Sequence, residues 1–195
     1  MIPKLIRVGI KTILKIICEK ITINNIEIVN KNNKFKGVID ELYIKAENII
    51  YNKINISWIN IKLSDLVLRL AINNKNFFID NCSAVIQVRL TTENINKTIF
   101  NNRWLSLKTS IESYILMSFK SIEIKNKSIN FLPSIEISNK DIKYTLQSDK
   151  NSISLVNNIN QKKLMILNDK NIFVNNLFFY ESYIELELSS KIIFN

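Results

Sequence analysis

The apolar positions of the chain recur at helical spacing in two places, and the clearer one is in the middle. Between residues 104 and 119, large apolar side chains fall on one stripe when each residue advances by about 100°. They are Trp104, Leu107, Ile111, Tyr114, Ile115 and Phe119. The stripe predicts an amphipathic helix over residues 104–118. Its other side carries Ser and Thr where a water-facing helix usually has Lys and Glu. We therefore expect this helix to be enclosed on more than one side.

Residues 2–20 also show helical spacing, with Pro3 in the first turn, where proline is tolerated. Isoleucine and leucine fill most of the helix surface, and the basic residues occupy a narrow arc of about 80°. This basic ridge consists of Lys4, Arg7, Lys11 and Lys15. Two interpretations remain open. Either the helix packs into the domain while its basic side chains reach solvent, or the ridge also touches anionic lipid.

Elsewhere apolar and polar residues alternate, which is the period of a β-strand. Such runs recur from residue 21 to 90 and again from 122 to 188, separated by turn signals about every 8 to 12 residues, the spacing of an antiparallel meander. A short helix is expected after Thr91 or Thr92, either of which can cap it. The alternation changes phase between Trp58 and Ile59, which predicts a bulge or bend.

These patterns predict one α+β domain over residues 1–195. A long, twisted antiparallel meander sheet is expected to wrap around the N-terminal helix and the central helix. With 195 residues and 47% hydrophobic content, the chain is long enough to form a substantial core.

The formal net charge of +10 points to an acidic partner surface. Only four of the 27 basic residues are Arg, the side chain that readers of bases rely on. The aromatic residues also lie within apolar alternations, so we do not expect nucleic acid as a partner. Cys18 and Cys82 are expected to be two buried free thiols, because one possible bridge is no disulfide framework in a chain of this size.

Several kinds of chemistry lack their usual residues. The chain has no His and only two Gly, which removes the common general base and any phosphate-cradling or nucleophile-elbow motif. No grouping of Cys or carboxylates resembles a zinc or calcium site. We expect no catalytic residues, no metal and no cofactor, and hence a protein that is not an enzyme.

No apolar run approaches the roughly 18 residues that a membrane-spanning helix needs. The basic ridge interrupts the apolar N-terminus, and no small-residue cleavage site follows it. We expect neither a signal peptide nor a transmembrane helix, and hence a location in the cytoplasm or on the cytoplasmic face of a membrane.

Several segments together carry a family resemblance. They are the N-terminal helix, the stretch from Gly37 to Asn48, Asn48-Ile49-Ile50-Tyr51 followed by Ile54-Asn55-Ile56, the helix start Leu90 to Asn96, and the closing strand pair Ile172 to Leu188. In this order and spacing the chain resembles the LmeA-like phospholipid-binding family of bacteria, particularly its cyanobacterial branch, in the tubular lipid-binding (TULIP) superfamily. The resemblance implies a curled antiparallel sheet around helices, with an apolar groove for acyl chains.

The expected function is therefore non-catalytic binding of phospholipid, another acyl lipid or an anionic membrane surface. The basic ridge is the candidate for the membrane contact. The candidates for the groove are Ile13, Ile17, Trp58, Ile111, Tyr114 and Ile115. The alternative is a protein-interaction scaffold in which core side chains simply fill the groove.

Overall fold

The structure is a computed structural model that describes residues 2–30, 38–71, 76–79, 82–135 and 143–192. Its helices are α1 (Ile2–Ile17), α2 (Thr92–Ile99) and α3 (Leu105–Ile115), and a 3-10 turn, η1 (Asn102–Trp104), precedes α3. The strands of the N-terminal half are β1 (Lys20–Val29), β2 (Val38–Tyr51), β3 (Ile54–Ala71), β4 (Asn76–Ile79) and β5 (Cys82–Thr91). The later strands are β6 (Phe119–Lys125), β7 (Ser128–Pro133), β8 (Tyr144–Asp149), β9 (Ser152–Asn157), β10 (Lys163–Asn168), β11 (Ile172–Phe179) and β12 (Tyr183–Ile192).

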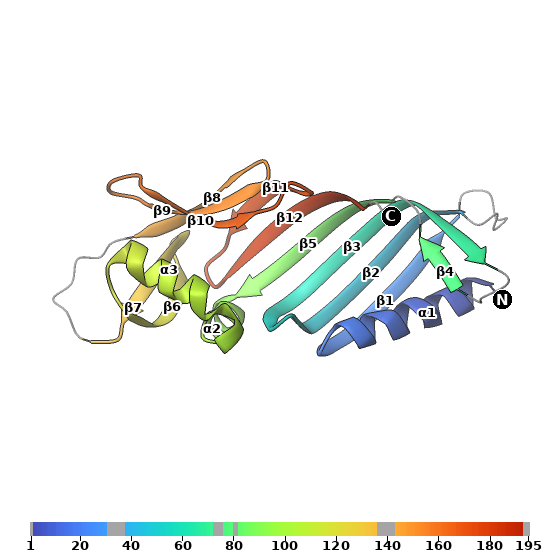
Figure 1. The fold of residues 1–195 in the computed structure, drawn as a ribbon, viewed down its shortest axis with the longest axis horizontal. Coiled ribbons are helices and arrows are strands. Elements are labelled where there is room, and N and C mark those ends of the chain that lie inside the picture. The colour runs from blue at the N-terminus through green and yellow to red at the C-terminus, as the bar shows by residue number, and fades with distance from the viewer. Residues whose placement is uncertain (1, 31–37, 72–75, 80–81, 136–142, 193–195) are drawn as a thin grey trace.

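The larger sheet has the strand order β1-β2-β3-β5-β12-β11, and β4 pairs with the end of β3. The pairs are antiparallel, and the C-terminal hairpin β11–β12 returns to join β5 through a register that runs from Tyr183↔Thr91 to Ile192↔Cys82. Helix α1 lies beside the N-terminal strands of this sheet (Figure 1). Its Ile6 belongs to a buried cluster with Ile39 and Leu42 of β2.

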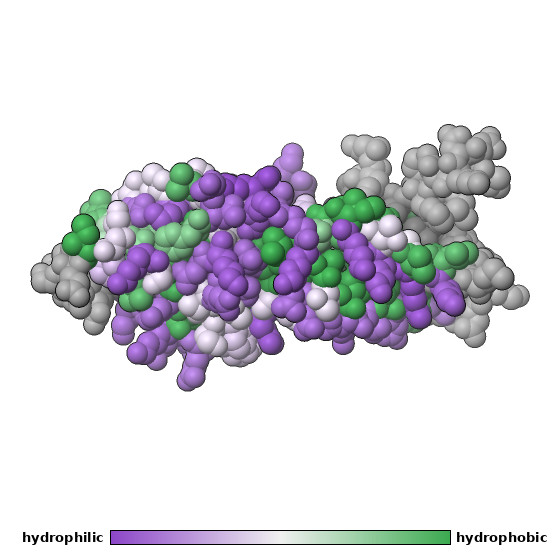
Figure 2. Space-filling view, turned by 90° about the horizontal axis from the view of Figure 1, so that it is seen from below, coloured by the Kyte–Doolittle hydropathy of each residue, from purple (hydrophilic) through white to green (hydrophobic). Residues whose placement is uncertain are grey.

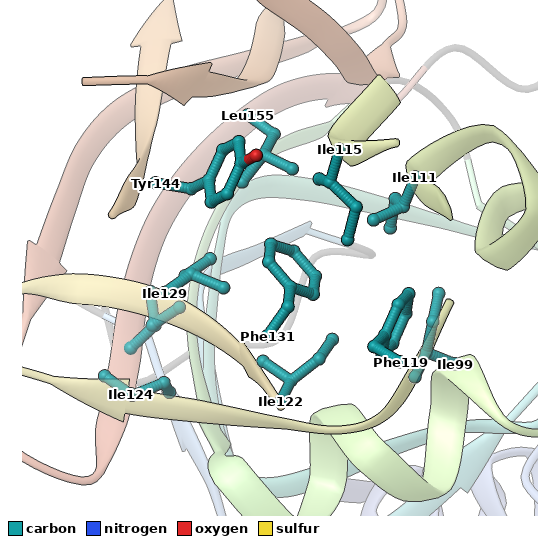
Figure 3. Packing of buried hydrophobic residues seen from close by; sticks show 11 residues of the cluster. Ile99, Ile111, Ile115, Phe119, Ile122, Ile124, Ile129, Phe131, Tyr144 and Leu155 are labelled. Carbon is teal, nitrogen blue, oxygen red and sulfur yellow. The ribbon is translucent and has the colours of Figure 1, made fainter. Parts of the chain in front are cut away.

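The smaller sheet has the order β10-β9-β8-β7-β6 and lies at the other end of the elongated molecule (Figure 1). A second buried cluster joins α2, α3, this sheet and β12. Figure 3 shows its side chains converging from separate elements, with Phe131 of β7 between Tyr144 of β8 and Phe119 of β6. The ring centres of Phe119 and Phe131 are 5.0 Å apart, and those of Phe131 and Tyr144 are 5.3 Å apart, both edge-on. The predicted α+β class is confirmed, with the antiparallel strands divided between two sheets.

Both predicted helices are shorter than expected. Helix α1 ends at Ile17, and Glu19 N already donates to Ile50 O of β2 at 2.8 Å. Helix α3 ends at Ile115, since Leu116 takes a left-handed conformation, and Phe119 is the first residue of β6. The apolar stripe of the central helix thus continues into a strand, where Phe119 is buried for a different reason.

The expectation that α3 is enclosed on more than one side is wrong. Its Ser and Thr residues at 106, 109, 110 and 113 are all exposed. Two of them satisfy their hydroxyls on the helix backbone, with Thr109 Oγ1 donating to Leu105 O at 3.0 Å and Ser110 Oγ donating to Ser106 O at 2.9 Å. Such local bonds make a hydroxyl face compatible with solvent, so it was no sign of burial.

The phase change at Trp58 and Ile59 does not come from a shift in pairing. The β2–β3 register is continuous from Tyr51↔Ile54 to Val38↔Val67. The change falls instead next to Asn48 of β2, whose φ is 53°. Asn tolerates this left-handed conformation better than most residues.

Candidate functional site

Helix α1 contacts the sheet along only part of its apolar surface. Ile6 is buried, and Ile10 and Leu14 pack partly buried against the same cluster. These three residues are spaced four apart, so they form one row along the helix. The apolar arc of the helix, from Leu5 through Ile6 to Leu14, covers about 180° of its circumference. The sheet therefore covers only part of the apolar surface of α1.

The uncovered part of that arc is an exposed apolar stripe formed by Leu5, Ile13 and Ile16, which are 63%, 54% and 76% exposed. Val8 and Ile17 at its margins are also more than half exposed. Single exposed apolar residues are ordinary on protein surfaces, but several together on one helix face mark an interaction site. Figure 2, which views the molecule from the side on which α1 lies, shows apolar and hydrophilic surface side by side over this half.

The basic ridge also lies on the solvent-facing surface of α1, with Val8 and Thr12 between it and the exposed apolar stripe. Lys4, Arg7, Lys11 and Lys15 are all exposed, and the helix contains no acidic residue. The solvent-facing arc is thus basic on one side and apolar on the other. A surface that approaches the helix side-on would meet both, because Lys and Arg have long, flexible apolar stems.

An apolar groove lies between α1 and strands β2 and β3. Its volume is about 230 Å³. The helix contributes Leu5, Ile6, Gly9, Ile10, Ile13 and Leu14, and the strands contribute Leu42, Ile44, Leu63 and Leu66. A Cβ added at Gly9 would meet no heavy atom within 4 Å, so this glycine borders open space. The exposed apolar stripe shares Leu5 and Ile13 with the groove, which makes the two features one continuous apolar site.

A second apolar cavity, of about 190 Å³, lies in the C-terminal half among α2, α3 and both sheets. Ile99, Ile111 and Phe131 contribute to its wall. No charged side chain lines it, so it has nothing to orient a polar headgroup.

The predicted groove residues are not brought together. Ile13 lines the α1 groove and Ile111 lines the second cavity. Ile17 is 52% exposed at the end of α1, whereas Ile115 is buried in the C-terminal cluster. The Tyr114 hydroxyl donates to Lys162 O and accepts from Asn157 N at 3.0 Å, so it fastens α3 to the turn between β9 and β10.

Trp58 lies on the opposite face of the large sheet from the α1 groove, which corrects its assignment to the groove. It pairs with Arg89 of β5 across the strands, and the Arg89 guanidinium lies 5.6 Å from its ring centre and 4.5 Å from that of Tyr183. Arg89 also donates to Glu185 Oε1 from Nε at 2.9 Å and from Nη2 at 2.6 Å. Apolar alternation could not reveal this, because it places Trp58 on a face without saying which face is covered.

The exposure of Leu5, Val8 and Ile16 was not predicted. The one available signal was the width of the apolar arc of α1, which exceeds the contact that one sheet face can make with a helix. The width of the arc indicates how much apolar surface stays uncovered by the sheet, but not which residues are exposed.

The thiols and carboxylates of the described residues add no reactive centre. Cys18 and Cys82 are both free, and burial raises the pKa of each thiol, which disfavours the reactive thiolate near neutral pH. Among the described residues, no three His, Cys, Asp or Glu side chains are grouped so that they could hold a metal ion.

Comparison with known proteins found no matching family model, no similar curated protein and no similar solved structure. The resemblance to LmeA-like proteins therefore stays a prediction. Within the described ranges, no helix has the length and apolar character needed to cross a membrane.

Proposed function

We propose that this chain is a non-catalytic lipid-binding protein that attaches to anionic membrane surfaces through α1. The observation that carries the proposal is the exposed apolar stripe next to the basic ridge on one helix. Interfacial helices combine an apolar face that enters the headgroup boundary with Lys and Arg that attract anionic lipid. The predicted relationship to LmeA-like phospholipid-binding proteins is compatible with this function and is part of the proposal.

Both the basic ridge and the exposed apolar stripe can contribute several kcal/mol to the free energy of membrane binding. Each basic residue near an anionic leaflet adds roughly 1 kcal/mol of attraction, so the four of the basic ridge supply up to about 4 kcal/mol. Full burial of a Leu or Ile side chain is worth roughly 1.5 to 3 kcal/mol. Leu5, Ile13 and Ile16 are more than half exposed, so much of that gain is still available on insertion.

The groove accommodates part of a lipid, not a whole one. Pockets that enclose small ligands usually have about 300 to 1,000 Å³, whereas the groove has about 230 Å³. We infer that a segment of one acyl chain enters between α1 and β2–β3 while the headgroup stays near the basic ridge. Surface attachment is then the main activity, and the groove contributes selectivity for the chain.

The alternative is a protein-interaction scaffold with a filled core. The observation in its favour is that both apolar cavities are smaller than ordinary ligand pockets. A scaffold would use the exposed apolar stripe to bind a protein partner, and lipid would not accompany the purified chain.

One set of variants separates these functions. Leu5→Ser/Ile13→Ser/Ile16→Ser should lose sedimentation with neutral phosphatidylcholine vesicles and most of its sedimentation with vesicles that also contain phosphatidylglycerol. Lys4→Gln/Arg7→Gln/Lys11→Gln/Lys15→Gln should lose most of its sedimentation with vesicles that contain phosphatidylglycerol and should differ little from the parent with neutral vesicles. Both variants should fold, since all seven side chains are more than half exposed or carry charges that face solvent.

Native mass spectrometry of the parent, with organic extraction, should reveal a co-purified acyl lipid. A parent that stays lipid-free and ignores both kinds of vesicle contradicts the proposal and favours the scaffold.

A further inference from the structure

Three large aliphatic side chains protrude at the end of the molecule opposite α1. Leu116 follows α3 and is 90% exposed, Ile135 follows β7 and is 74% exposed, and Ile159 lies between β9 and β10 and is 73% exposed. We call these three residues the distal tip. The ends of α3, β7 and β9 lie at the left of Figure 1, whereas α1 lies at the right, and apolar surface is visible at the same left end in Figure 2.

Hydrogen bonds connect the three segments that carry the distal tip. Ser134 N donates to Ser118 O at 3.0 Å, which places the residue before Ile135 beside the end of α3. The hydroxyl of Tyr114, the penultimate residue of α3, bonds to both Asn157 and Lys162 at the two sides of the β9–β10 turn. The three protruding side chains therefore share one end of the fold, although Leu116 and Ile159 are 43 positions apart in the chain.

Leu116 has a backbone conformation that does not suit its side chain. Its φ of 57° and ψ of 35° are left-handed, a conformation in which helices usually end with Gly or Asn. The other non-glycine residues with positive φ in the described part of the chain are Asn, Lys, Asp or Gln. A strained aliphatic residue that packs on almost nothing has no role in stability, and such local violations occur at functional positions.

Ile159 is held at the crest of an ordered turn. Asn157 Oδ1 accepts from Ile159 N at 2.8 Å, and Gln161 N donates to Asn157 O at 2.9 Å. Lys162 N donates to Asn160 Oδ1 at 3.0 Å. These backbone amides already have hydrogen-bond acceptors within the turn. The turn can therefore leave water without losing a hydrogen bond at any of them. That is a requirement for any backbone that enters a lipid interface.

The described segments around the distal tip carry exposed lysines. Lys120, Lys143, Lys162 and Lys163 are exposed there, in segments 112–120, 132–135, 143–146 and 155–164. The carboxylate within these segments is Glu112, and it accepts from Lys108 Nζ at 2.8 Å and from Phe119 N at 3.3 Å. An anionic surface would thus meet these lysines beside the protruding side chains.

We propose that the distal tip is a second site of contact with an anionic bilayer, where Leu116, Ile135 and Ile159 enter the headgroup boundary. Three separate protrusions on three turns suit a fluid surface better than a protein groove, and Lys is depleted in protein–protein interfaces. Because α1 lies at the other end of the molecule, two such contacts would allow the chain to bridge two membranes. The bridging rests on the proposed function of α1, whereas the distal contact does not.

The test compares vesicle sedimentation with vesicle clustering, followed by light scattering, using phosphatidylcholine vesicles that contain phosphatidylglycerol. The parent should cluster them. Leu116→Gly/Ile135→Ser/Ile159→Ser should still sediment with vesicles but cluster them at least tenfold less. Combined with Leu5→Ser/Ile13→Ser/Ile16→Ser, it should abolish the binding that remains in the α1 variant. Phe173→Ser, at a 45% exposed position on β11, serves as the control for loss of one exposed apolar side chain.

A charge-matched pair of variants provides a readout that does not alter the apolar residues. Lys143→Gln/Lys162→Gln/Lys163→Gln should reduce clustering several-fold. Lys127→Gln/Lys150→Gln/Lys170→Gln removes three exposed lysines from turns at the opposite end of the same strands and should not. Equal effects of the two triple variants, or a distal-tip variant that clusters vesicles like the parent, would overturn the proposal. If instead the α1 variant binds like the parent while the distal-tip variant loses all binding, the distal contact stands and the proposed function of α1 fails.

Discussion

The two halves of this molecule use similar apolar sequences with different results. In the C-terminal half, α2, α3, the smaller sheet and β12 enclose one cluster in which Phe119 and Leu155 are each only 1% exposed. In the N-terminal half, one helix covers one face of one sheet, and Ile16 of that helix remains 76% exposed. The difference teaches that an apolar stripe becomes core only where a second layer covers it. Where that layer is missing, the stripe is available for binding.

The contrast between the two halves predicts that the exposed residues of α1 contribute much less to the free energy of unfolding than the residues of the C-terminal core. Phe119 packs edge-on against Phe100 and Phe131, with ring centres 5.6 Å and 5.0 Å away. Phe119→Ala should lower the free energy of unfolding by about 3 to 5 kcal/mol, because it leaves a cavity. Ile16→Ala should change it by less than about 0.5 kcal/mol. Urea titrations followed by circular dichroism measure both, and a similar loss for the two variants would mean that α1 is as well covered as the core.

A substitution at Gly9 tests the N-terminal half by filling the apolar groove between α1 and strands β2 and β3. Gly9→Leu places a side chain where the groove is open, so it should reduce the amount of co-purified or extracted acyl lipid. It should also stabilise α1 by up to about 1 kcal/mol, because Gly is the poorer helix former. Vesicle sedimentation should persist, since the basic ridge and Ile16 are unchanged. Gly9→Ala is the matched control, with a similar gain in stability and little filling. Unchanged lipid content in Gly9→Leu would contradict the groove.

The smallest expected effect concerns an ion pair in the covered half. Hydrogen bonding from Lys108 lowers the pKa of Glu112 below its usual value, with a further contribution from the amide of Phe119. A carboxyl with a depressed folded pKa stabilises the fold above its unfolded pKa of about 4.3, and this stability is lost as the pH falls through the folded value.

Glu112→Gln should therefore cost roughly 0.2 to 1 kcal/mol at pH 7, a range typical of partly exposed pairs. This cost should shrink in urea titrations at successively lower pH, because the stability that the charge provides is lost as the pH falls through the folded pKa. Glu93→Gln, which removes a more exposed pair with Lys97, serves as the control and should cost less. A cost for Glu112→Gln that persists in acid would mean that the side chain acts through packing and not through its charge.

Periodicity located most of the secondary structure but not its ends. The central helix is confirmed from Leu105 to Ile115. Phe119 falls on the same stripe of a helical wheel, but it belongs to β6. The left-handed turn at Leu116 separates the two, and no residue pattern announces it, because Gly or Asn would be expected there. The four hydroxyl residues of α3 led to the wrong expectation that this face of the helix is enclosed. A Ser or Thr that bonds to its own helix backbone can face water.

The candidate site could be predicted only in part. The basic ridge followed from the spacing of Lys4, Arg7, Lys11 and Lys15, which depends on helix geometry alone, and all four side chains are exposed. The predicted groove residues do not line one groove, because Ile13 and Ile111 line different cavities and Trp58 lies on the other sheet face. A strand pattern says that two faces exist, but the pairing partners decide which face is covered.

By itself, the sequence determined the α+β class, the two amphipathic helices and the basic ridge, because periods of 3.6 and 2 act within a few neighbouring residues. Tertiary structure alone decided that β12 pairs with β5, which joins Tyr183 to Thr91 across 92 positions of the chain. It also decided which side of α1 stays uncovered and that Leu116 and Ile159 share one end of the fold. The physical reason is that burial is a property of contacts between distant segments, and those contacts depend on how complete sheets and helices pack against one another.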